Sequence, residues 1–311
     1  MLKIESPTRP KTIADLVSDD VMARIGGLDL ASRKIFRGKL QGERRSKKRG
    51  ESVEFADHRP YVVGDDLRHI DWNVYGRLDH LFMKLFLEDE DLSLHIVIDA
   101  SLSSDCGEPS KLLFMQKAAM ALGYVGLVNL NRVTATAIGG VQGGVISAIR
   151  DLRGRRRTQD LARWICTIEP TGILPFTESC KRIAMSRRGR GIMIVMSDFF
   201  IKEGYEDGLR MLAGHGYDVF ALQVLSPQEV DPTGPNGIAG DLRLRDVEDE
   251  DFAEITVSAP LLKRYKATLD AYRDNLRTFC ARREIMHMTT QSDMPIDTLL
   301  VDSLRRKGVL K

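Results

Sequence analysis

Oxygen-bearing side chains at two-residue spacing are the strongest chemical signal in this chain. Asp99, Ser101 and Ser103 follow the apolar run Leu-His-Ile-Val-Ile, so they stand where a buried strand ends and a loop begins. A second apolar run, Gly-Ile-Met-Ile-Val-Met, leads in the same way to Asp198. In open α/β sheets, ligands gather beyond the carboxyl ends of the strands. If the two strands are neighbours, both carboxylates and both hydroxyls face a common point.

This set of side chains predicts a metal site that binds a partner and performs no reaction. All-oxygen ligands with few charges suit a hard cation, Mg²⁺ first and Mn²⁺ or Ca²⁺ as alternatives. A D-x-D hydrolase loop would carry a second aspartate where this chain has Ser101, and the six histidines form no H-x-x-x-H pair. We expect an acidic side chain of another protein to complete the metal shell. Two alternatives stay open, a helix-capping turn and a metal-dependent hydrolase or phosphatase that uses Asp99 and Asp198.

Composition narrows the class of protein. With 311 residues, 43% hydrophobic and 29% charged, the chain is an ordinary globular sequence. The net charge of +2 does not favour a nucleic-acid partner. The basic runs 44–49 and 153–157 leave two interpretations open, either solvated loops or sites that associate with nucleic acid. Four cysteines without a C-x-x-C pair indicate reduced thiols, so we expect a cytoplasmic protein. No segment approaches the ~18 apolar residues of a membrane helix, which predicts no membrane segment.

Residues 92–311 are expected to form one α/β domain. Fully apolar strands alternate with amphipathic helices there, which predicts a mostly parallel sheet with helices on both faces. The glycine-rich segment 139–144 joins two strand-like pieces and predicts a hairpin that adds an antiparallel edge strand. A second hairpin is expected as an insertion near 241–257.

Residues 1–91 are expected to form a smaller N-terminal region with two short helices within 13–40 and β-strands near 52–55 and 82–88. Between those strands lies a run in which charges of both signs alternate with aromatic residues. We expect a structural set of ion pairs beneath aromatic rings, not a catalytic cluster. The residues of this run are Arg59, Tyr61, Gly64, Asp65, Asp66, Arg68, Asp71 and Trp72.

These motifs resemble known families. The Asp99-x-Ser-x-Ser loop, Asp198 and the antiparallel edge strand resemble the von Willebrand factor A fold with its metal-ion-dependent adhesion site (MIDAS). The run from Arg59 to Trp72 resembles the signature of the bacterial domain-of-unknown-function family 58 (DUF58), and the similarity extends over the chain from about residue 30. The resemblance implies a non-enzymatic partner of MoxR-type AAA+ ATPases. It would act as an adaptor in a chaperone-like system that matures or remodels other complexes.

The resemblance also implies a ligand set. Asp99, Ser101 and Ser103 match the first metal motif, and Asp198 matches the last. The fold usually offers a threonine just before the helix that here begins near Pro175. Thr171, which we take as the fifth ligand, or Thr177 fills this place, or Leu174 occupies it and weakens the site.

Overall fold

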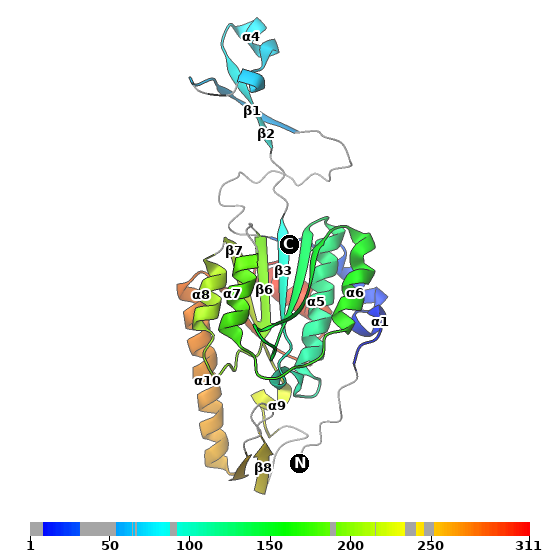
Figure 1. Ribbon diagram of the computed structural model, residues 1–311, viewed down its shortest axis with the longest axis vertical. Coiled ribbons are helices and arrows are strands. Elements are labelled where there is room, and N and C mark those ends of the chain that lie inside the picture. The colour runs from blue at the N-terminus through cyan, green and yellow to red at the C-terminus, as the bar shows by residue number, and fades with distance from the viewer. Residues whose placement is uncertain are drawn as a thin grey trace. The chain divides into compact units, whose positions relative to one another are not determined.

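The computed structural model describes residues 9–31, 54–63, 65, 67–87, 92–186, 191–214, 216–233, 241–245 and 252–311. The chain divides into two compact units, a smaller one within 40–91 and a larger one that holds the rest (Figure 1). In this division the smaller unit begins at residue 40, whereas the expected N-terminal region begins at residue 1. Helices α1 (Ile13–Leu16) and α2 (Asp19–Ile25) belong to the larger unit, because their apolar side chains are buried in its core.

The larger unit is built on a six-stranded sheet with the order β10-β7-β6-β3-β4-β5. Neighbouring strands are parallel except for β5, which pairs antiparallel with β4 and forms one edge. The predicted fold class, a mostly parallel α/β sheet with one antiparallel edge, is confirmed. The strands are β3 (Ser93–Asp99), β4 (Arg132–Ile138), β5 (Val145–Leu152), β6 (Gly191–Ser197), β7 (Tyr217–Leu225) and β10 (Met286–Gln291).

Helices cover both faces of this sheet, and each face has its own hydrophobic cluster (Figure 1). Because side chains alternate along a strand, Ile96 and Ile98 of β3 pack on one face while Val97 packs on the other. The first face carries α5 (Lys111–Val128), α6 (Thr158–Cys166) and the C-terminal π-helix η4 (Thr298–Leu304). The second face carries α7 (Phe176–Ser186), α8 (Glu206–Ala213) and α10 (Ala259–Arg282).

Helix α5 is the central helix of the core. Among the described residues it is the one helix that is long and apolar enough to cross a membrane, judged by length and composition alone. The expectation that no segment approaches this length was therefore wrong for α5. However, 83% of the helix is buried inside the fold, which is the usual environment of a core helix in an α/β sheet protein.

A short hairpin extends the larger unit, as predicted near 241–257. Strands β8 (Asp241–Arg245) and β9 (Phe252–Thr256) pair antiparallel. The short helix α9 (Pro227–Val230) follows β7, and Ser226 caps it by accepting a hydrogen bond from the Glu229 amide.

The smaller unit is a two-stranded ribbon with helical turns between its strands. β1 (Glu54–Pro60) pairs antiparallel with β2 (Phe82–Leu87), with an irregular register between Phe55 and Asp57. A 3₁₀ turn, η1 (Leu67–His69), and helix α4 (Trp72–Leu78) lie between the strands. Helix α4 has only seven residues and was not predicted from the sequence.

Ion pairs stabilise this smaller unit. Arg59 donates two hydrogen bonds to the Asp65 carboxylate at 2.6 and 2.8 Å. Asp71 caps α4 by accepting hydrogen bonds from the first helical amides, and His58 Nε2 lies 2.9 Å from its carboxylate. The hydrogen bond with His58 is the main reason why the pKa of Asp71 falls to about 2. Lys84 adds a longer contact of 3.5 Å.

The aromatic residues of the signature do not all cover these ion pairs. Trp72 is 62% exposed and packs edge-on against Tyr75, with ring centroids 6.1 Å apart. The expectation of a covering ring was therefore wrong for Trp72. Tyr61 is half-buried and Arg68 is exposed. Gly64 and Asp66 lie outside the described residues.

Candidate functional site

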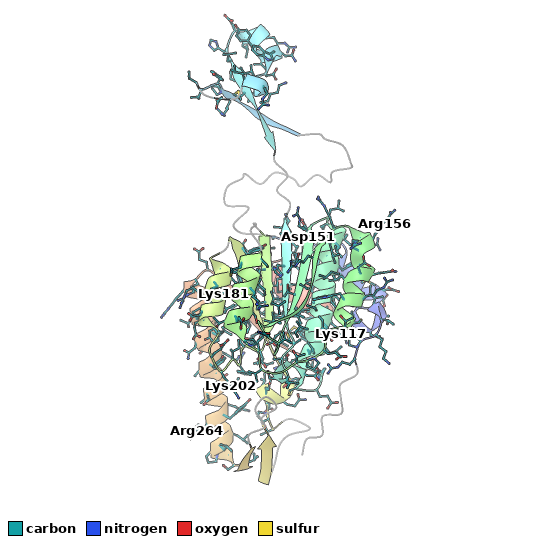
Figure 2. The ribbon with its side chains drawn as sticks, viewed as in Figure 1. Lys117, Asp151, Arg156, Lys181, Lys202 and Arg264 are labelled. Carbon is teal, nitrogen blue, oxygen red and sulfur yellow. The ribbon has the colours of Figure 1, made fainter. Side chains whose placement is uncertain are left out.

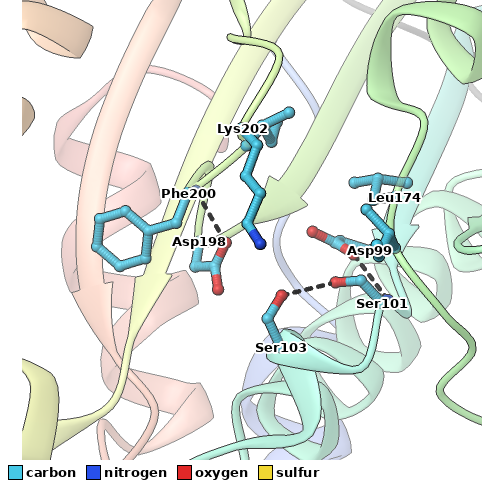
Figure 3. A pocket seen from close by; sticks show the side chains of 9 residues that line it. Asp99, Ser101, Ser103, Leu174, Asp198, Phe200 and Lys202 are labelled. Atoms are coloured by element: carbon cyan, nitrogen blue, oxygen red, sulfur yellow. Dashed lines mark hydrogen bonds between the residues drawn. The ribbon is translucent and has the colours of Figure 1, made fainter. Parts of the chain in front are cut away.

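Two strand ends bring the predicted carboxylates together. β3 and β6 are parallel neighbours, and Ile98 pairs with Met196, so Asp99 and Asp198 leave the sheet at the same edge. Together with Ser101 and Ser103 they line one pocket, drawn in Figure 3. Its free volume is about 10 Å³, roughly the space of one water molecule.

The loop after β3 is held by its own hydrogen bonds. The Ser101 amide donates to Asp99 Oδ1 at 2.9 Å, and the hydroxyls of Ser101 and Ser103 lie 3.0 Å apart. Ser104, which the sequence analysis did not single out, is fully buried and donates to the carbonyls of Asp99 and Ser101 at 3.0 and 2.9 Å. The carboxylate and both hydroxyls are thus oriented by the folded loop itself.

Ser197 connects this loop to the one that carries Asp198. Its hydroxyl donates to Asp99 Oδ2 at 2.6 Å and accepts a hydrogen bond from the Phe199 amide at 2.9 Å. Asp198 is oriented in turn by the Phe200 amide, which donates to its Oδ1 at 3.0 Å. Both carboxylates therefore have fixed orientations toward the pocket.

The turn after Asp198 contains an unusual backbone conformation. Phe199 has φ of +59°, in the left-handed region that non-glycine residues rarely adopt. Its ring is fully buried and packs edge-on against Phe176 and Tyr205, and its carbonyl accepts a hydrogen bond from the Tyr272 hydroxyl on α10. Packing and this hydrogen bond stabilise the strained turn that positions Asp198.

A buried lysine pairs with Asp198. Lys111, the first residue of α5, places Nζ 2.7 Å from Asp198 Oδ2 and 2.6 Å from Glu229 Oε1. The side chains of Lys111 and Asp198 are only 2% and 3% exposed. Burial by itself lowers the pKa of Lys111, but the two carboxylates outweigh it and raise that pKa above its ordinary value. Sequence reasoning missed this residue, although a lysine in the first turn of a helix opposes the helix dipole and indicates an acidic partner.

Negative charge is in excess around the pocket. Asp198 and Glu229 share the buried ammonium of Lys111. Asp99, which accepts hydrogen bonds from the Ser101 amide and the Ser197 hydroxyl, adds a third carboxylate. Burial, and then the charge of Asp198, raise the pKa of Asp99 to about 6. A cation in the pocket would compensate this charge. Figure 3 shows the Lys202 ammonium pointing toward the space between Asp99 and Asp198.

Thr171 takes a different position from the other predicted ligands. Its amide donates to the Ala100 carbonyl at 2.8 Å, so the backbone runs beside the Asp99 loop. Its hydroxyl is buried near Gly139 and has no hydrogen-bond partner among the described residues. Leu174, together with Ile173, lines the pocket instead. Thr177 lies on α7, and its amide donates to Glu203.

The donor set fits a hard cation better than a transition metal. Within the described residues there is no group of three or more His, Cys, Asp or Glu side chains that could hold a metal ion. Carboxylate and hydroxyl oxygens, which suit Mg²⁺, Mn²⁺ or Ca²⁺, supply the polar lining of the pocket apart from Lys202. The pocket volume also matches a single ion.

Of the two basic runs, residues 44–49 lie outside the described residues. The other, 153–157, includes the 3₁₀ turn η3 (Arg155–Arg157), whose Arg157 pairs with Asp160 at 3.1 Å. Figure 2 shows Arg156 at the end of the sheet opposite to Lys202. This basic run is therefore remote from the acidic pocket.

Fold and site together define an α/β protein with an acidic, hydroxyl-rich pocket at the carboxyl ends of two adjacent parallel strands. The chain belongs to the family described as "Protein of unknown function DUF58", whose profile matches residues 57–275. This match runs from the middle of β1 in the smaller unit into α10 of the larger unit, and it does not include α1 and α2.

The chain is similar to the uncharacterized protein Rv1480 of Mycobacterium tuberculosis, with 26% identity over 304 residues that cover 95% of this chain and 93% of that protein. Among solved structures it is similar to BatB from Bacteroides thetaiotaomicron, with 12% identity, 70% and 98% of the two chains covered and a TM-score of 0.39. A von Willebrand factor type A structure from Catenulispora acidiphila shares 10% identity over 73% of this chain and 44% of that chain, with a TM-score of 0.35. The fold class of this chain rests on its own strand order.

Proposed function

We propose that this protein is a non-enzymatic, metal-dependent adaptor that binds other proteins through the pocket at Asp99. The observation that carries the proposal is the convergence of two carboxylates and two hydroxyls on a space the size of one ion. Asp99, Ser101, Ser103 and Asp198 would hold the cation, with Mg²⁺ preferred and Mn²⁺ or Ca²⁺ also suited to the oxygen ligands. When bound, the cation supplies an open ligand position for a carboxylate of the partner.

The geometry favours binding over hydrolysis. Asp198 is engaged by Lys111 and by the Phe200 amide, so it is poorly placed to act as a general base. These features support an adaptor in which Asp99 and Asp198 serve as ligands only.

The proposal extends to partner and compartment. Membership of the DUF58 family supports cooperation with a MoxR-type AAA+ ATPase in the assembly or maturation of other protein complexes. The client would present an acidic side chain to the pocket. All four cysteines are free thiols, which is compatible with a reducing compartment such as the cytoplasm.

Calorimetric titration of Mn²⁺ and Mg²⁺ into the full chain tests the metal site. Asp99→Asn should weaken binding at least about tenfold, equivalent to about 1.4 kcal/mol, because it removes a buried anionic ligand. Asp105→Asn is the matched control. Asp105 follows the same loop but pairs with Arg9 outside the pocket, and its substitution should leave the heats unchanged. Equal heats from wild type and Asp99→Asn would sink the metal assignment.

Two further measurements separate the adaptor from its alternatives. Co-purification with a MoxR-type ATPase should be lost in Asp99→Asn and retained in Asp105→Asn. Metal-stimulated turnover of an aryl phosphate that disappears in Asp198→Asn would show an enzyme and overturn the adaptor proposal.

A further inference from the structure

We infer that a groove beside the acidic pocket binds an arginine side chain of a partner protein. The groove lies between the 201–206 loop and α10 and has a volume of about 450 Å³, within the range of roughly 300–1,000 Å³ for ligand pockets. We call it the aromatic groove after its lining residues Tyr205, Glu206, Tyr272, Asn275 and Phe279. The inference goes beyond the proposed function and does not depend on a cation at Asp99.

The rings of the aromatic groove form a continuous cluster. The Tyr205 ring lies 5.9 Å from Tyr272 and 5.6 Å from Phe279, both edge-on. Tyr205 is only 5% exposed and lies beneath the surface, so the half-buried rings of Tyr272 and Phe279 are the ones that a cation can approach. The protein contains such a cation–π contact, in which the guanidinium carbon of Arg283 lies 4.0 Å from the ring centroid of Phe279. Arg283 is not part of the groove lining.

A carboxylate supplies the complementary charge. Glu206 is exposed and makes no hydrogen bond or ion pair with any residue that the structure describes. Its charge is close enough to the aromatic cluster to add to burial in raising the pKa of Tyr205 to about 12. Glu203 also lines the groove, but it accepts a hydrogen bond from the Thr177 amide. Glu206 is thus the carboxylate that remains available to a ligand.

The cation at the rim does not cancel this charge. Lys202 lines both the aromatic groove and the acidic pocket, and Figure 3 shows its ammonium directed toward the pocket side, between Asp99 and Asp198. The charged residues of the groove lining are Glu203, Glu206 and Lys202, so the lining combines aromatic rings with a net negative charge. A guanidinium group suits both, since it stacks on aromatic rings and forms paired hydrogen bonds with a carboxylate.

The aromatic groove and the acidic pocket are adjacent. They share Ile201 and Lys202, and the Phe200 ring of the pocket contacts the Tyr272 ring of the groove with centroids 5.3 Å apart. A bound segment that places an acidic residue at the pocket can place an arginine in the groove. Two neighbouring contacts of opposite charge would fix the direction of that segment.

Nuclear magnetic resonance titration of the full chain with acetyl-Gly-Arg-Gly-amide tests the inference, with the citrulline peptide as a neutral isostere. The experiment contains a chelator, so its outcome is separate from metal binding. We expect the arginine peptide to shift the resonances of residues 203–206 and 272–279 and to bind at least fivefold more tightly than the citrulline peptide. Glu206→Gln should weaken arginine binding by a similar factor.

Asp207→Asn is the matched control, because Asp207 is the next residue on α8 but pairs with Arg210 and does not line the groove. It should leave binding unchanged. Equal affinity for arginine and citrulline, equal affinity of wild type and Glu206→Gln, or shifts confined to other surfaces would each overturn the inference.

Discussion

Lys111 and Asp198 form a buried ion pair next to the acidic pocket, with Nζ 2.7 Å from Oδ2. Glu229 binds the same ammonium at 2.6 Å from a less buried position, 25% exposed. Lys111 does not line the pocket, so it neutralises Asp198 from a side that a ligand in the pocket does not reach. The remaining negative charge stays on the pocket side, where it is available to a cation.

Lys111→Met should destabilise the protein. It leaves Asp198 without its buried counter-ion, and loss of one partner of such a pair costs about 3–5 kcal/mol. Urea unfolding in the presence of a chelator should show the lower free energy of unfolding. Millimolar Mg²⁺ should restore part of this free energy, because a cation replaces the missing positive charge. Lys117→Met, at another position of α5, is the control. Equal unfolding free energies for wild type and Lys111→Met would show that the ion pair does not contribute.

Lys202→Ala should increase metal affinity. Its ammonium points toward the two carboxylates (Figure 3), so it competes with a bound cation by charge repulsion, and its removal should tighten Mn²⁺ binding by roughly tenfold. Lys181→Ala removes the same charge from α7, away from the pocket, and should leave the affinity nearly unchanged. Weaker Mn²⁺ binding in Lys202→Ala would mean that this lysine supports the site.

Thr171→Val tests whether Thr171 is a metal ligand or only lies near the site. Because the hydroxyl lies outside the pocket lining and has no partner among the described residues, we expect unchanged Mn²⁺ affinity. We also expect a stability gain of up to about 1 kcal/mol from removing an unpaired buried hydroxyl. Ser103→Ala should instead weaken Mn²⁺ binding severalfold. A loss in Thr171→Val as large as in Ser103→Ala would show that Thr171 is a ligand.

His287 should make stability depend on pH. Burial, assisted by the charges of Lys307, Arg273 and Arg277, lowers its pKa from 6.5 to about 4. Between these values the unfolded chain binds a proton that the folded protein does not, so stability decreases as the pH falls from 6.5 to about 4. If the ring were fully buried, this pKa difference would lower the free energy of unfolding by about 3 kcal/mol. The ring keeps some solvent contact, so we expect a decrease of about 1 kcal/mol.

Unfolding free energies measured at several pH values for wild type and His287→Gln isolate this contribution, because other titrating groups are common to both proteins. The difference between the two should change over this pH window. The control His80→Gln, at an exposed position, should follow the wild-type curve. A constant difference between wild type and His287→Gln would refute the linkage.

Local sequence patterns were sufficient for most of the fold. The apolar run before Asp99 is a strand because a fully buried parallel strand must be apolar throughout, and β3 is buried at every position. The same reasoning located β6 and the antiparallel edge after the glycine-rich segment. It failed at α4, where seven mostly exposed residues that begin with Trp72 carry little apolar periodicity.

The Asp99-x-Ser-x-Ser loop and Asp198 could be read from the sequence because each is a local feature of a strand end. The sequence determined which oxygen atoms are available and that they follow apolar strands. Only the tertiary structure decided that β3 and β6 are neighbours. It also decided that Lys111 contacts Asp198, 87 residues away in the sequence, and Glu229, 118 residues away. Finally, it decided that Leu174 lines the pocket while Thr171 does not. These relationships depend on strand order and on the packing of distant segments, which local residue spacing does not encode.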